Sequence, residues 1–63
     1  NDQIKEVIKE LPENQQQVIE GFYFNEMSQE QLAKHLNVPI GTIKSRLRLA
    51  LAKLKLKLGE NHD

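Results

Sequence analysis

A short turn at residues 37–42 constrains the fold of this chain more than any other feature. Asn37 enters the left-handed backbone region at low cost, and Pro39 and Gly41 follow it closely. Residues with helical apolar spacing lie on both sides of this turn, so few residues are left for the connection. Two helices joined so tightly must cross at a steep angle. The turn therefore predicts an all-α fold whose last two helices form a helix-turn-helix.

Apolar period and helix-ending residues predict a small four-helix domain. The four predicted helices are residues 2–11, 13–24, 28–36 and 42–58. The first should end before Pro12, since the residue that precedes a proline avoids the α region, and Pro12 then opens the second. Ser28 and Gln31 have the spacing of a capping box at the start of the third helix. Gly59 is predicted to end the fourth helix.

The same periodicity predicts which side chains form the core. In the second helix the expected packing positions are Val18, Ile19, Phe22 and Tyr23. In the fourth helix one wide stripe is expected to be core: Ile43, Leu47, Ala50, Leu51, Leu54 and Leu58. Gly21 should weaken the second helix by ~1 kcal/mol relative to Ala unless a neighbouring helix needs close approach there.

Length and composition limit the possible functions. With 63 residues the chain is one small domain, which leaves little room for a catalytic cavity. It has no cysteine, and its two histidines are far apart, so we expect no disulfide, metal or cofactor. No membrane span or signal peptide is visible, and a cytoplasmic location is expected. The chain starts without Met and ends in polar residues, so we expect residues 1–63 to be a fragment of a longer protein.

The charges are divided between the two halves of the chain. Residues 1–30 contain seven acids and two bases, whereas residues 31–59 contain seven bases and no acid. A block of one sign inside a chain of zero net charge suggests a surface that faces a polyanion. The alternative is a solvated helix face that happens to be basic.

The start of the fourth helix has the properties of a DNA-recognition helix. Thr42, Lys44 and Ser45 are short or polar, so this end can enter a major groove, where the partial positive charge of the helix start favours phosphate. The alternative at this point is an ordinary helical hairpin.

A set of motifs makes the chain resemble a known family over residues 4 to 58. The set comprises Leu11-Pro12-Glu13, Val18-Ile19, Tyr23, Met27-Ser28, Glu30, Leu32-Ala33, Leu36, Val38-Pro39 and Gly41-Thr42-Ile43-Lys44-Ser45-Arg46-Leu47. With these motifs the chain is similar to region 4 of bacterial sigma factors, especially the extracytoplasmic-function group. The resemblance implies a four-helix domain that recognises the −35 element of double-stranded promoter DNA and binds the β-subunit flap of RNA polymerase. An anti-sigma protein is a further partner of this kind of domain.

The resemblance also assigns roles to residues. Lys44, Ser45 and Arg48 would face base edges, because positions i, i+1 and i+4 from the helix start present neighbouring side chains to the groove. The residues expected near phosphates are Thr42, Gln29 and Gln16. Arg46 points to another flank, where a phosphate contact and an ion pair with an acid such as Glu30 are equally expected.

Three other classes of function are weighed against this one. A LuxR-type regulator domain is another four-helix unit, but it usually has a histidine near the position of Arg46. A helical interaction module would instead use the outward row Leu49, Ala52 and Leu56 to bind another protein. An enzyme is the weakest alternative, because the sequence shows no nucleophilic cysteine, metal cluster or glycine-rich phosphate loop.

Overall fold

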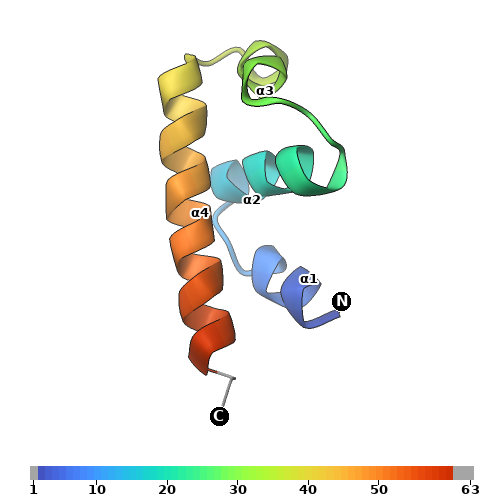
Figure 1. Cartoon of the computed structure of the whole chain (residues 1–63), viewed down its shortest axis with the longest axis vertical. Coiled ribbons are helices and arrows are strands. Elements are labelled where there is room, and N and C mark those ends of the chain that lie inside the picture. Colours follow the sequence, from blue (N-terminus) through green and yellow to red (C-terminus); the bar gives the residue numbers. More distant parts are fainter. Residues whose placement is uncertain (1, 61–63) are drawn as a thin grey trace.

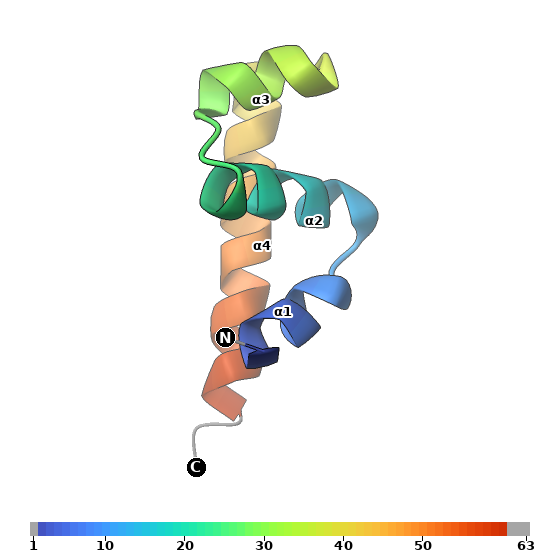
Figure 2. The same ribbon diagram turned by 90° about the vertical axis from the view of Figure 1, so that its right-hand side faces the viewer.

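A computed structural model describes residues 2–60, and this part of the chain consists of helices and their connections. The elements are α1 (Asp2–Lys9), α2 (Glu13–Ile19), the π-helix η1 (Glu20–Phe24), α3 (Gln29–Leu36) and α4 (Ile40–Glu60). Figure 1 shows α1, α2 and α3 stacked along one side of α4, and Figure 2 shows α4 running behind all three. The predicted all-α class, with a helix-turn-helix at its end, is confirmed.

The first helix is shorter than predicted. It ends at Lys9, and the amides of Glu10 and Leu11 then donate to the carbonyls of Val7 and Ile8, each at 3.0 Å. These bonds span three residues instead of four, which tightens the last turn before Pro12. The expected end at residue 11 was therefore two residues too late.

The second predicted helix is divided into two kinds of helix. Its α-helical part ends at Ile19, and the last five residues form the wider turn of a π-helix, in which the amide of Asn25 donates to the carbonyl of Glu20 at 3.1 Å. Gly21 lies in this turn, and a Cβ atom there would be 2.5 Å from Cδ2 of Leu32 in α3. The close approach of another helix explains why a glycine is found here.

The last helix is longer than predicted at both ends. It begins at Ile40 and runs through Gly59 to Glu60, so the expected stop at Gly59 is wrong. Glycine ends a helix most effectively when it takes a left-handed conformation, and Gly59 does not have a positive φ. The helix therefore continues with only the propensity cost of glycine.

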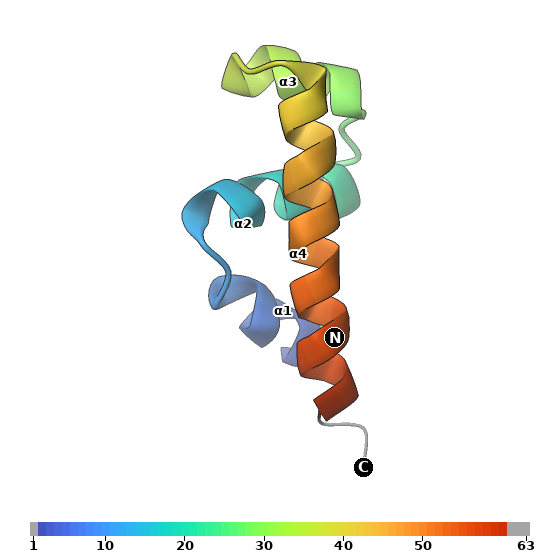
Figure 3. The same cartoon turned by 90° about the vertical axis from the view of Figure 1, so that its left-hand side faces the viewer.

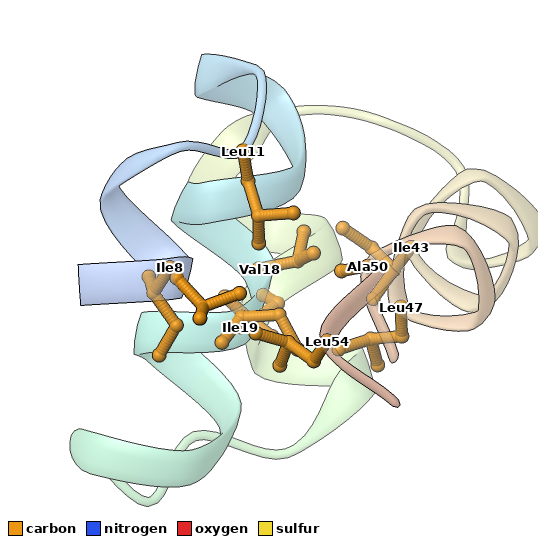
Figure 4. Packing of buried hydrophobic residues seen from close by; sticks show 10 residues of the cluster. Ile8, Leu11, Val18, Ile19, Ile43, Leu47, Ala50 and Leu54 are labelled. Carbon is orange, nitrogen blue, oxygen red and sulfur yellow. The ribbon is translucent and has the colours of Figure 1, made fainter. Parts of the chain in front are cut away.

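The core lies between α4 and the other helices (Figure 4). Its buried members are Val7, Ile8, Leu11, Val18, Ile19, Leu32, Ile43, Leu47, Ala50 and Leu54. Phe22 and Leu58, which were also predicted as core, are half-buried and pack against this cluster. The predictions for Tyr23 and Leu51 are wrong, because these residues are 53% and 41% exposed. Both point toward the region beside the short α1, where no further helix of residues 2–60 covers them.

Candidate nucleic-acid interface

Two local motifs fix the start and end of α3. The Ser28 amide donates to Oε1 of Gln31 at 2.8 Å and the Gln31 amide donates to Oγ of Ser28 at 3.0 Å, so the predicted capping box is confirmed. At the other end Asn37 takes the predicted left-handed conformation, with φ at 59°. The Val38 amide then donates to the Ala33 carbonyl at 3.0 Å, which satisfies one of the last carbonyls of α3.

The turn into α4 is short and hydrogen-bonded. The Pro39 carbonyl accepts from the amides of Thr42 and Ile43, at 3.0 and 3.3 Å. Ile43 is fully buried, as is nearly all of Leu32 in α3, so the two helices of the motif share one core. This core holds the first turns of α4 in a fixed orientation relative to α3.

The three residues predicted to face bases lie together at the exposed start of α4. Lys44, Ser45 and Arg48 are all exposed and belong to the first three turns of the helix. Their side of the helix is turned away from Ile43 and Leu47, which are buried against the other helices. The start of α4 therefore presents two cations and a hydroxyl to solvent on one surface.

The three residues predicted to contact phosphate and Arg46, for which a phosphate contact was one of two expectations, are half-buried, and they come from three different helices. Thr42 is in the first turn of α4 and Gln29 is the first residue of α3. Gln16, in α2, donates from Nε2 to Oε2 of Glu20 at 3.3 Å. Arg46 forms no ion pair with Glu30, since within the described residues the recorded ion pair joins Lys57 and Glu10 at 3.6 Å.

A second surface on the same flank of α4 was missed by the sequence analysis. An open groove of about 580 Å³ lies between α1, η1 and the second half of α4. Its lining is apolar except for the Tyr23 hydroxyl and one lysine: Ile4, Ile8, Ile19, Tyr23, Phe24, Leu51, Leu54, Lys55 and Leu58. The consecutive aromatic residues 22–24 were a signal for it, because one helix face cannot bury three successive side chains. Phe22 is half-buried, and its ring meets that of Tyr23 edge to face at 5.0 Å.

Residues 2–60 contain no cluster of histidine and carboxylate side chains that could hold a metal ion. None of the helices in this range has the length and hydropathy that crossing a bilayer requires.

The steeply crossed α3 and α4, with a polar and basic helix start, define a helix-turn-helix domain. Residues 1–54 match the family described as sigma-70, region 4. The chain is also 42% identical over 55 residues to the ECF RNA polymerase sigma factor RpoE of Cereibacter sphaeroides. The chain therefore belongs to the sigma-70 region 4 family, as its motifs predicted, and not to the LuxR-type regulators.

The similarity to that relative has a limited extent. It covers 87% of this chain but 30% of the relative, so this chain spans less than a third of the length of that sigma factor. No solved structure matches the chain.

Proposed function

We propose that this domain recognises the −35 element of promoter DNA and binds the flap of the RNA polymerase β subunit during transcription initiation. One observation carries the DNA part of the proposal: the exposed set Lys44, Ser45 and Arg48 at the start of a helix whose orientation is fixed by a buried core. Membership of the sigma-70 region 4 family supports the same function.

The chemistry of the three residues suits the edges of base pairs. Lys44 and Arg48 can donate to O6 and N7 of guanine, and such a contact contributes ~1–3 kcal/mol of discrimination when the geometry is good. The Ser45 hydroxyl both donates and accepts, so it fits either kind of base edge. Thr42, Gln29, Gln16 and Arg46 are the proposed phosphate contacts, which orient the domain without reading sequence.

The apolar groove supports the polymerase part of the proposal. Leu51 lies seven residues beyond Lys44, which places the groove about 10 Å farther along α4 from the base-reading residues. The two ligands can therefore bind at the same time. The flap would enter the groove with apolar side chains against Tyr23 and Phe24, and an acid of the flap would pair with Lys55 at the rim. An anti-sigma protein that occupied the groove would prevent polymerase binding.

The DNA part is tested with duplexes that the wild-type domain selects from a randomised library. Lys44→Ala and Arg48→Ala should each weaken binding to the selected duplex by ~1–3 kcal/mol and relax the sequence preference. Lys53→Ala is the matched control, because it removes the same charge from an exposed position on another side of α4. It should lower affinity slightly and equally for every duplex.

Two outcomes would contradict the assigned roles. Equal losses on selected and scrambled duplexes would show that Lys44 and Arg48 hold phosphates and do not read bases. A wild-type domain without any salt-dependent DNA binding would favour a pure protein-interaction module, since each phosphate contact contributes about −0.9 to the slope of log K against log salt.

A further inference from the structure

The outer face of α4 carries an apolar row that no other part of residues 2–60 covers. Leu49 is 53% exposed, Leu56 is 66% exposed, and Ala52 between them is also exposed. In Figure 1 all the other helices lie on one side of α4, and Figure 3 shows α4 from a view in which it stands in front of them. This row is separate from the apolar groove, which is lined by Leu51 and Leu58 on another flank.

The row has the spacing of a coiled-coil seam. Leu49, Ala52 and Leu56 follow one another at i, i+3 and i+7, which are successive a, d and a positions of a heptad. In this register the e and g positions flank the seam and face the partner helix, and those between residues 48 and 55 are all basic: Arg48, Lys53 and Lys55.

We propose that this face of α4 binds an acidic amphipathic helix of another protein, in a short two-stranded coiled coil. The partner helix would place apolar residues at its a and d positions and glutamates at e and g, opposite the three cations. Charges at e and g decide which helices pair, because opposite charges attract across the seam and like charges repel. Two copies of α4 paired through the same row would bring cations together, so the charge pattern disfavours a homodimer.

A seam of only three residues is sufficient for binding because the folded domain already holds α4 in its helical conformation. An isolated helix must be ordered on binding, but α4 is already fixed by the core residues Ile43, Leu47 and Leu54 on its opposite side. Leu56 also lines an open cavity of about 390 Å³ with Val7 and Leu11, next to the ion pair of Lys57 and Glu10. One end of the partner helix therefore gains further apolar contact with residues outside α4.

A bilayer surface fits this face less well than a helix does. The row occupies a strip about 60° wide at ~100° per residue, whereas a helix that lies on a membrane needs an apolar face wider than about 100°. Lys53 and Lys55 border the strip directly and would be drawn into the apolar layer. The narrow strip matches the width of a single partner helix.

The test uses a synthetic peptide of about three heptads with Leu at a and d and Glu at e and g, and a second peptide with Lys at e and g. The like charges at e and g also keep each peptide from pairing with itself at neutral pH. Fluorescence anisotropy should show that the wild-type domain binds the Glu peptide and not the Lys peptide. Binding should weaken as salt is added, because exposed ion pairs are screened.

Two sets of variants locate the binding site. The double variant Leu49→Gln, Leu56→Gln should weaken binding of the Glu peptide at least tenfold, about 1.4 kcal/mol. Leu51→Gln is the matched control, because it makes the same change at an exposed leucine of the groove flank and should leave this binding unchanged.

The charge-reversed variant Lys53→Glu, Lys55→Glu should lose binding of the Glu peptide and gain binding of the Lys peptide. Circular dichroism and the melting temperature should be unchanged in the leucine variants, since these side chains are exposed.

Several results would overturn the proposal. These are equal binding of both peptides by the wild-type domain, retention of the Glu peptide by the Leu49→Gln, Leu56→Gln variant, self-association of the wild-type domain through this row, or preferential binding of anionic phospholipid vesicles. This proposal shares Arg48 and Lys55 with the function proposed above, but Leu49 and Leu56 belong to this proposal alone. DNA binding by the Leu49→Gln, Leu56→Gln variant and flap binding by the same variant should persist, so the two proposals can fail separately.

Discussion

The first and second halves of α4 differ in chemistry along the same flank of one helix. The first half exposes Lys44 and Arg48, whereas the second half exposes Leu51 beside the aromatic side chains of η1. DNA requires cations and hydrogen-bond donors, and a protein partner requires apolar surface that can be buried. Under the proposed function, one continuous helix serves two ligands because these requirements are met in separate turns.

The division depends on a shared core below both halves. Ile43 is fully buried under the first half, and Leu54, 9% exposed, lies under the second. The exposed side chains of both halves are therefore not needed to form the core.

Ile43→Ala should have the largest effect, because it leaves a cavity where α3 and α4 meet. We expect a loss of ~2–5 kcal/mol in the free energy of unfolding, measured by urea denaturation. DNA binding should fall with it. Leu54→Ala is the matched truncation under the second half and should cost less, since Leu54 keeps some contact with solvent. If Leu54→Ala lost more unfolding free energy than Ile43→Ala, the main core would lie under the groove.

Gly21→Ala should come next, because the added Cβ would lie 2.5 Å from Cδ2 of Leu32, a side chain that is 1% exposed and cannot move freely. Overpacking of this kind costs ~1–3 kcal/mol, which exceeds the helix propensity that alanine gains. Thermal unfolding measures the difference. Gly41→Ala is the control, since no atom outside its own helix and chain neighbours lies within 4 Å of the Cβ position there. A stabilised Gly21→Ala variant would contradict the close approach of η1 and α3.

Leu51→Gln should separate the two halves functionally. Affinity for a purified flap segment of the polymerase should fall about fivefold to tenfold, ~1 kcal/mol, because an exposed apolar contact of the groove is replaced by a polar group. Affinity for DNA should not change. Isothermal titration with each ligand gives both values, and Leu49→Gln on the outer face is the control. Equal loss of both ligands would mean that the halves of α4 do not act separately.

Glu26→Gly should have the smallest effect, and a favourable one. Glu26 has φ at 57°, in the left-handed region that costs a residue with a Cβ atom ~1–2 kcal/mol. The greater flexibility of glycine in the unfolded chain offsets part of this cost, so we expect a gain of about 0.5 kcal/mol in unfolding free energy. Chemical denaturation measures it, and Glu26→Ala should give no such gain. A loss on Glu26→Gly would argue against the left-handed conformation.

Local chemistry explains what the sequence predicted well. Ser28, Gln31 and Asn37 act through hydrogen bonds and backbone preferences within a few residues, and the structure has the capping box and the left-handed turn where they were predicted. Glu26 carries no such signal, because glutamate has no preference for the left-handed region, and its conformation follows from the tertiary position of η1 and α3.

Burial was harder to predict than secondary structure. Helical period placed Leu51 and Tyr23 in the core, but a period identifies a face of a helix and not whether another element covers it. The short α1 leaves both residues open. Among the residues proposed to contact DNA, the exposed positions of Lys44, Ser45 and Arg48 agree with their proposed role, and their contacts with bases stay a prediction.

Because α4 is one unbroken helix from Ile40 to Glu60, it fixes the distance and the angle between residues at its two ends. An α-helix rises ~1.5 Å and turns ~100° for each residue, so Leu58 is held about 21 Å from Lys44 at a fixed angle around the axis. Inserting one residue between the two halves would rotate one ligand surface by about 100° relative to the other. Under the proposed function, a domain bound to the polymerase through one end of α4 would then present Lys44 and Arg48 away from the groove of the DNA, although every contacting side chain was still present.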